Sequence, residues 1–364
     1  MWPMLRRGLL LCAIVVIQFV VIEAALRAYG EYAGATTFGE LFMDDPAVGI
    51  RLRPNASIRY TTVEFTTDIR INPEGVRDDD PIGPKAPGEK RIVVLGDSLV
   101  LSVQVQAAQT FCERLEARLN AEAPGTRWRV INAGVQGYGP VEQWMFFDRV
   151  AAAFEPDIVM MVVFVGNDAL EAADGAETLS TGRPKVVAEP GARQWRRLIR
   201  SSVVLQAVRV RWDQLRSRLA LGTPERPLAS YLADPPPVVA EGLEQSRQAF
   251  GKIAERARGL GAAPAFVLMP ARFQVNDEDY GNLDAAVRQA GGVLDRQSAS
   301  RRFEQALAPL GVPMIDLQPI LARQPEPNGV FFQRNVHLTP RGHDVVASAL
   351  HQFLRSNSVL SSKF

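Results

Sequence analysis

The sequence predicts an α/β fold in which a parallel β-sheet is covered by helices on both faces. From residue 91 to the C-terminal region, short apolar runs alternate with longer amphipathic segments. The apolar runs are continuous rather than alternating, which is typical of strands buried on both faces. The expected strands lie at 91–98, 129–134, 156–168, 264–273 and 312–317. The expected helices lie at 107–121, 140–153, 238–259, 281–309 and 340–355.

The N-terminus predicts a membrane anchor. Arg6 and Arg7 precede an apolar run from Gly8 to Ile22, which continues past Glu23. The run is about 18 residues long, just enough to cross a bilayer as a helix. Arginines before the run favour a cytoplasmic N-terminus with the rest of the chain outside. A cleaved signal peptide is the alternative, although the run is not followed by a good small-x-small cleavage site. Either way, the main domain is expected to be extracytoplasmic, in the periplasm.

The chain divides into three expected parts. Residues 1–30 form the anchor, 31–90 a short β-rich lead-in, and 91–356 the main domain, with a helical insertion at about 169–237. The centre of the insertion, 192–220, carries eight arginines against one acidic residue and has apolar residues at three- and four-residue spacing. We interpret it as an amphipathic basic helix. It either caps the domain or lies on an anionic membrane surface or substrate groove.

Composition narrows the classes of function. The 364 residues are 47% apolar and 22% charged, which is typical of a globular chain, and the net charge of +1 gives no whole-molecule case for nucleic acid binding. The two cysteines do not imply a disulfide framework, and no cluster of Cys and His suggests a metal site. We therefore expect neither a metal nor a cofactor.

Four expected loops at the carboxyl edge of the sheet carry residues suited to acyl transfer. The first strand ends in Gly-Asp-Ser-Leu at 96–99, the second in Asn-Ala-Gly at 132–134, and the third in Gly-Asn-Asp at 166–168. A loop with His337 follows the fifth strand. Ligands of parallel α/β sheets bind beyond the carboxyl ends of the strands, so these residues are expected to meet. Each motif alone is an ordinary turn or loop, but together they supply a nucleophile, a tight backbone turn, an amide and a base.

His337 is the expected general base. Serine is a weak nucleophile until a base takes its proton, and histidine suits that role because its pKa lies near neutrality. All three histidines lie near the C-terminus, at positions 337, 343 and 351. His343 and His351 fall inside a helical pattern and are expected to be structural, whereas His337 lies in the loop before it. We therefore expect His337 to activate Ser98.

Three donors are expected to bind the oxyanion of the tetrahedral intermediate. They are the backbone N–H groups of Ser98 and Gly134 and the side-chain amide of Asn167. A glycine at position 134 allows the backbone to approach closely.

These residues resemble the blocks of the SGNH, or GDSL, hydrolase family. Ser98 matches the nucleophile of the first block, Gly134 the second block, Asn167 the third and His337 the last, over residues 91–355. The resemblance implies a three-layer α/β/α sandwich of the flavodoxin-like SGNH type, an acyl-enzyme ester mechanism and no metal. Membrane-anchored bacterial members have a similar outline. Some of these relatives move O-acetyl groups on exported polysaccharides, so transfer is also implied.

Two departures from the family pattern bear on catalysis. The family usually has an Asp two or three residues before the base, where this chain has Asn335 and Arg334. Glycines usually follow the serine soon, where this chain has Ser102 and Gln104. In a serine triad, Asp→Asn costs about 10⁴ in rate because the wrong histidine tautomer is held. The chain would then be a slow hydrolase, an enzyme with an acid from elsewhere, or a binding protein.

Asp316, at the end of the fifth strand, is the nearest substitute for the missing acid, although a turn or helix cap is its plainer interpretation.

The sequence as a whole predicts an anchored serine esterase acting on acylated glycans or lipids, with O-acetyl esters favoured. Ser98 attacks, His337 transfers the proton and Asn335 orients His337. The alternatives are an O-acetyltransferase and a weakened glycan-binding subunit of an envelope polysaccharide machinery. The sequence does not name the acyl group or the alcohol, and it does not separate hydrolysis from transfer.

Overall fold

The central element is a five-stranded parallel sheet with the strand order β6-β5-β7-β8-β9. The computed structural model describes residues 2–32, 38–62, 64–122, 125–184, 202–205 and 226–357. All five expected strands are present: β5 (Glu89–Gly96), β6 (Arg127–Gly134), β7 (Ile158–Phe164), β8 (Ala263–Met269) and β9 (Met314–Asp316). The predicted fold class is therefore confirmed.

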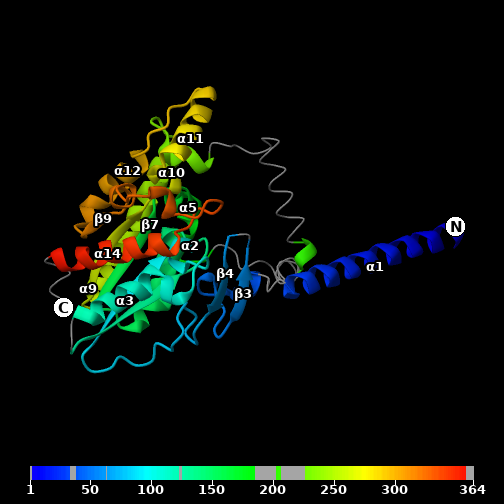
Figure 1. Cartoon of the computed structure of the whole chain (residues 1–364), viewed down its shortest axis with the longest axis horizontal. Coiled ribbons are helices and arrows are strands. Elements are labelled where there is room, and N and C mark those ends of the chain that lie inside the picture. Colours follow the sequence, from blue (N-terminus) through cyan, green and yellow to red (C-terminus); the bar gives the residue numbers. More distant parts are fainter. Residues whose placement is uncertain are drawn as a thin grey trace.

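Helices cover both faces of the sheet (Figure 1). In β5, Ile92 and Val94 point to one apolar cluster and Val93 and Leu95 to the other, as the two-residue period of a strand requires. The first face is covered by α3 (Phe111–Glu122), α13 (Gln318–Ala322) and α14 (Pro340–Ser356), and the second by α4 (Pro140–Arg149), α9 (Pro237–Gly259) and α12 (Ser298–Leu307). The result is the predicted three-layer α/β/α sandwich.

The strand order places a topological switch point at β5. From β5 the chain moves to β6 on one side and then to β7 on the other. Beyond the carboxyl ends of these strands lie α2 (Ser98–Leu101) and α5 (Asp168–Asp174). Ligands bind at such a switch point in open α/β sheets, so the fold brings the candidate site residues to the expected edge.

The prediction of one long helix at 281–309 is wrong. The chain forms α10 (Arg272–Val275) and α11 (Asp277–Gln289), and then turns before α12 begins at Ser298. Gly291 has a φ of +81°, a left-handed conformation that ends a helix readily in glycine. The helix expected at 107–121 begins later, because a 3-10 turn at Ala107–Gln109 precedes α3. The other short elements are α6 (Ala176–Thr181) and 3-10 turns at Phe38–Leu41, Ala151–Phe154, Arg226–Tyr231, Ala308–Leu310 and Pro327–Gly329.

The lead-in folds as two antiparallel hairpins that pack on the main domain. They are β1 (Phe42–Asp45) with β2 (Gly49–Leu52), and β3 (Ser57–Thr61) with β4 (Thr66–Arg70). Leu52, Ile58 and Ile69 belong to the same apolar cluster as Val93 of the central strand. The lead-in therefore shares a core with the sheet and is more than a spacer after the N-terminal helix.

The N-terminal helix α1 (Trp2–Tyr32) extends away from the rest of the chain (Figure 1). Its segment Leu10–Ala28 has a mean hydropathy of 2.3 and is long and apolar enough to cross a membrane, a test that a signal sequence also passes. The Glu23 carboxylate on this helix accepts hydrogen bonds from the Ser202 hydroxyl (2.8 Å) and the Val203 N–H (3.1 Å). Apart from 202–205, the basic helix expected at 192–220 lies outside the described residues.

Candidate active site

Ser98 begins α2 directly after the central strand. Asp97 caps this helix, because its Oδ1 accepts a hydrogen bond from the Leu99 N–H at 2.8 Å. Burial raises the pKa of the Asp97 carboxyl to about 6. As the first residue of the helix, Ser98 has an N–H with no partner within the helix itself. Ser98 is therefore held at the strand edge with its N–H and hydroxyl directed away from the helix interior.

The strand β6 holds α2 against the sheet. The Asn132 side-chain amide donates to the Val100 carbonyl at 2.7 Å. A Cβ at Gly134 would lie 2.4 Å from the Leu101 nitrogen and 2.6 Å from the Val100 Cβ, so only glycine permits this approach. Gly134 thus allows α2, the helix that carries Ser98, to pack closely against β6.

Ser98, His337 and Asn335 form one hydrogen-bonded chain. His337 Nε2 lies 2.9 Å from Ser98 Oγ, and His337 Nδ1 contacts Asn335 Oδ1. The backbone N–H of His337 donates to the same Asn335 oxygen at 3.2 Å. Because a backbone N–H is always a donor, it fixes the oxygen of the amide toward the ring. Nδ1 then carries the proton, and the Nε2 lone pair faces the serine hydroxyl, which is the tautomer that a general base needs.

The asparagine supplies orientation without charge. Burial lowers the pKa of His337 to about 4, so the imidazole is neutral at physiological pH. Both ring nitrogens are engaged by Ser98 and Asn335, and Asp316 has another role: its Oδ1 accepts the Gln318 N–H at 2.9 Å. Asp316 therefore caps a turn, which was the plainer interpretation of the sequence, and is not a substitute acid.

Two of the three expected oxyanion donors already have hydrogen-bond partners. The Gly134 N–H donates to Asn132 Oδ1 at 3.2 Å, and the Asn167 side-chain nitrogen donates to Glu171 Oε1 at 2.8 Å. An amide nitrogen carries two hydrogens, so one remains for a substrate oxygen. The oxyanion roles of Ser98, Gly134 and Asn167 stay predictions.

The other two histidines lie on α14 and have packing roles. His343 is buried, accepts the Phe111 N–H at Nδ1 (3.2 Å) and stacks on the Phe111 ring with centroids 5.8 Å apart. Burial lowers the pKa of His343 to about 3. His351 Nε2 lies 3.2 Å from the Glu122 carboxylate. Across the part of the chain that the structure describes, no three His, Cys, Asp or Glu side chains gather as a metal site would require.

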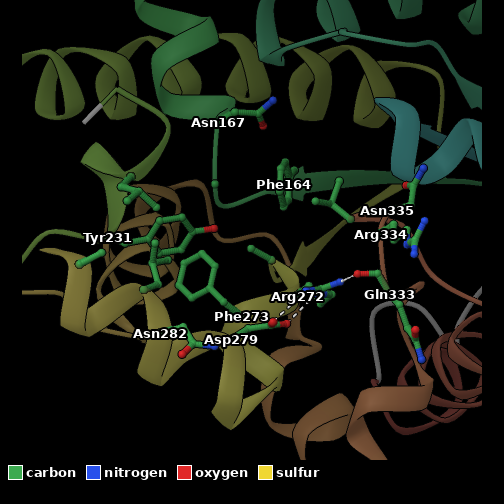
Figure 2. A pocket seen from close by; sticks show the side chains of 16 residues that line it. Phe164, Asn167, Tyr231, Arg272, Phe273, Asp279, Asn282, Gln333, Arg334 and Asn335 are labelled. Atoms are coloured by element: carbon green, nitrogen blue, oxygen red, sulfur yellow. Dashed lines mark hydrogen bonds and ion pairs between the residues drawn. The ribbon is translucent and has the colours of Figure 1, made fainter. Parts of the chain in front are cut away.

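A cavity of about 670 Å³ lies at the Asn335 end of this chain of hydrogen bonds (Figure 2). Pockets of 300–1,000 Å³ are typical of small-molecule sites. Asn167 and Asn335 line it, whereas Ser98 and His337 are not among its lining residues. The rest of the wall combines aromatic and aliphatic side chains with amides and charged groups, among them Phe164, Leu228, Tyr231, Phe273, Leu283, Asn282, Gln333, Arg272, Asp279 and Arg334.

Arg272 supports the loop that carries the base, a role that the sequence did not reveal. Its guanidinium pairs with both oxygens of Asp279, at 2.6 and 2.8 Å, and donates to the backbone carbonyls of Phe332 (3.0 Å) and Gln333 (Figure 2). Its position three residues after β8, at the same strand edge as the other site residues, is the signal that could have identified it.

Comparison with protein families agrees with this geometry. The model of the GDSL-like lipase/acylhydrolase family matches residues 94–345, which is more than half of the chain and includes Ser98 and His337. The chain belongs to this family. It is therefore a hydrolase of ester bonds, and its site is built on a GDSL-type fold.

Several solved structures resemble this GDSL-like chain at low identity. A lipase/acylhydrolase from Enterococcus faecalis is 11% identical, with 73% of this chain and 96% of that chain covered and a TM-score of 0.41. Axe2, an acetylxylan esterase from Geobacillus stearothermophilus, is 12% identical, with 72% and 93% covered and a TM-score of 0.42. A two-domain esterase active on acetylated mannans is 14% identical, with 75% and 50% covered and a TM-score of 0.41. Comparison with curated proteins found no match. The family assignment therefore rests on the match over residues 94–345.

Proposed function

We propose that the chain is a membrane-anchored, extracytoplasmic serine esterase that removes acyl groups from glycans or lipids through an acyl-enzyme. The observation that carries this proposal is the hydrogen-bonded chain from Ser98 through His337 to Asn335, with a 670 Å³ cavity at its Asn335 end. Family membership supports the ester chemistry, and the residue roles, the location and the substrate class are the proposal's own.

The proposed reaction has two halves. Ser98 Oγ attacks the ester carbonyl carbon while its proton moves to His337 Nε2, forming a tetrahedral intermediate. The bond to the alcohol oxygen breaks, His337 returns the proton to that oxygen, and the acyl group stays on Ser98. Water then attacks the acyl carbon while His337 takes its proton, the bond to Ser98 Oγ breaks, and His337 returns the proton to Oγ as the carboxylic acid leaves. In both halves Ser98 N–H, Gly134 N–H and Asn167 would bind the oxyanion.

Asn335 makes this a neutral version of the serine triad. It holds the ring in the productive tautomer, so the penalty that follows when an asparagine selects the wrong tautomer does not apply. It does not stabilise the imidazolium that forms during attack, because it has no charge. The proposal therefore includes slower acylation than a carboxylate in the same place would give.

The cavity wall supports an acylated sugar or lipid as substrate. Aromatic faces such as those of Phe164, Tyr231 and Phe273 can pack on a sugar ring or an acyl chain, and the amides of Asn282 and Gln333 can bond to hydroxyls. The cavity is larger than an acetyl group needs, so part of it would hold the remainder of the substrate.

Active-site labelling tests the proposal. The full-length chain, purified in detergent micelles, should react with a fluorophosphonate probe at a single residue, and Ser98→Ala should abolish both labelling and hydrolysis of a simple acetyl ester. Ser348→Ala is the matched control, because this serine on α14 only bonds its hydroxyl to the Asp344 carbonyl. Equal labelling of the parent and Ser98→Ala would refute the nucleophile assignment.

Location and substrate need their own measurements. An alkaline phosphatase reporter fused after Phe364 should be active in a bacterial host, since that enzyme works only after export. Hydrolysis of acetylated oligosaccharides should be compared with hydrolysis of medium-chain lipid esters. An inactive reporter would contradict the orientation, and turnover of neither class would contradict the substrate proposal.

A further inference from the structure

A buried arginine from the lead-in binds the segment that carries the nucleophile. Arg77 is 3% exposed and donates to the carbonyls of Leu101 (2.7 Å), Val105 (2.6 Å) and Ser102. Burial lowers the pKa of Arg77 to about 10, which leaves the guanidinium charged at neutral pH. Its three carbonyl partners all lie within seven residues of Ser98 in the chain.

Two of these carbonyls, those of Leu101 and Ser102, need a donor because they end the single turn of α2. The last carbonyls of a helix have no partner within the helix, and a buried carbonyl without a donor is costly. The segment Leu99–Leu101 is at most 3% exposed, so water does not reach it readily. A planar guanidinium has five N–H donors in a fixed fork, which suits it to gather several carbonyls at once.

The same contacts account for the departure at Ser102, where relatives tend to have glycine. Ser102 has a φ of +55°, a left-handed conformation that is strained for a residue other than glycine. Its hydroxyl donates to the carbonyls of Leu99 (2.7 Å) and Val100 (3.0 Å), while Arg77 binds its own carbonyl. The strained turn is therefore stabilised by the hydroxyl of Ser102 itself and by the guanidinium of Arg77.

A tight turn in the lead-in presents Arg77. Asn72 Oδ1 accepts the N–H groups of Glu74 and Val76, both at 3.1 Å, and Gly75 has a φ of +81°. This turn reverses the chain after β4. It places Arg77, two residues after Gly75, against the end of α2. The lead-in thus contributes a side chain to the support of the nucleophile.

We propose that Arg77 is a positioning residue for Ser98, which makes the lead-in part of the catalytic unit. The inference rests on the proposed function, since it assumes that Ser98 is the nucleophile. Arg77 does not touch a substrate. It holds α2 in the position in which Ser98 Oγ contacts His337 Nε2 and the Ser98 N–H faces the substrate oxygen.

Arg129 provides a matched control. Its guanidinium also ties the lead-in to the sheet, through Asp78 (2.9 Å) and the carbonyls of Asp80, Pro81 and Ile82, but none of these partners belongs to the nucleophile segment. Loss of either arginine weakens the docking of the lead-in, and only loss of Arg77 releases α2.

The experiment compares Arg77→Ala and Arg129→Ala in the full-length chain in detergent micelles. The readouts are the rate constant of fluorophosphonate labelling, kcat and KM for a simple acetyl ester, and the unfolding temperature. Arg77→Ala should slow labelling and kcat by about 10²-fold with little change in KM, since small misplacements of reacting groups cost this much. Guanidinium ion at a non-denaturing concentration should restore part of the rate. Arg129→Ala should lower the unfolding temperature but keep the parent labelling rate.

Equal labelling rates in the two variants would overturn the role of Arg77. Should Arg77→Ala fail to fold, Arg77→Lys keeps the charge but loses the fork, so it should still label slowly, and a parent-like rate would overturn the role. A parent that does not label would instead overturn the proposed function, and this inference with it.

Discussion

Ser98 and His337 meet at 2.9 Å, yet the segments that carry them lie in different surroundings. The nucleophile side, residues 96–105, is enclosed: Val100 and Leu101 are fully buried, and the sheet, Gly134 and Arg77 surround them. The base side, residues 332–337, is more open: Val336 is 58% exposed and lines the cavity together with Gln333, Arg334 and Asn335, although the flanking Phe331 and Leu338 are buried.

The two sides are also held by different kinds of arginine contact. On the nucleophile side, Arg77 is buried and binds backbone carbonyls. On the base side, Arg272 is partly exposed, and both its acidic partner Asp279 and the loop carbonyl of Gln333 belong to cavity-lining residues. The comparison teaches that buried contacts fix the position of the nucleophile segment, whereas the cavity-lining residues concentrate on the base side. Asn335, which departs from the family pattern, is on the open side.

The largest expected effect comes from crowding the enclosed side. Gly134→Ala puts a methyl group 2.4 Å from the Leu101 nitrogen and must displace α2, since the neighbouring atoms are backbone and a buried valine. Activity should fall by at least about 10²-fold, because the serine moves relative to the base. Steady-state hydrolysis and the fluorophosphonate labelling rate measure this loss.

Gly259→Ala is the control for that change. This glycine ends α9, and a Cβ there meets nothing within 4 Å, so activity and stability should stay close to the parent. Normal activity in Gly134→Ala would show that α2 is not held as tightly as its burial indicates.

A smaller effect is expected from loosening the open side. Arg272→Met removes the donors to the Phe332 and Gln333 carbonyls and leaves Asp279 without this partner. We expect kcat/KM to fall by about tenfold, which corresponds to about 1.4 kcal/mol, a usual value for a charge-assisted hydrogen bond. A loss as large as that of Gly134→Ala would remove the contrast between the two sides. Asp279→Asn should act in the same direction and tests the pair.

The smallest effect on activity is expected at His343, which contributes to stability rather than to catalysis. His343, on the helix after the base loop, accepts the Phe111 N–H of α3. Its folded pKa of about 3 lies below the unfolded value of 6.5, so the unfolded state binds the proton first. This contribution to stability is complete above pH 6.5 and is lost as the pH falls toward 3.

Denaturant unfolding of the parent and His343→Phe between pH 7 and pH 4.5 measures that contribution. The variant should be less stable at pH 7 by roughly 1–3 kcal/mol, because the Phe111 N–H loses its acceptor, and should lose less stability on acidification. An acid dependence equal to that of the parent would contradict the role of His343.

Much of this arrangement follows from the sequence. Continuous apolar strands predicted the sheet, and the polar residues at their ends predicted the edge at which Ser98 and His337 meet. The break between α11 and α12 was not predicted, because a helical period does not show whether Gly291 adopts a left-handed φ. The sequence did not reveal Arg77 and Arg272 for a different reason. Both bind backbone carbonyls distant in sequence, and because every residue has a carbonyl, the residue type of the partner gives no signal.

Asn335 shows what the residue type alone does and does not predict. A neutral residue beside the base indicated a loss of catalysis through the wrong tautomer. The structure adds that the backbone N–H of His337 already fixes the amide oxygen toward the ring. Only the electrostatic part of the missing carboxylate is then absent, which changes the expected size of the defect.

The pH dependence of kcat/KM in the parent and in Asn335→Asp tests this account most directly. The parent should lose activity only as the pH falls through about 4, because burial lowers the pKa of His337 and the base must be neutral. A carboxylate at position 335 should move this limb to higher pH and raise the plateau by about 10- to 10²-fold, as an adjacent opposite charge raises a histidine pKa by about one to two units. An identical limb and plateau in both proteins would contradict the neutral triad of Ser98, His337 and Asn335.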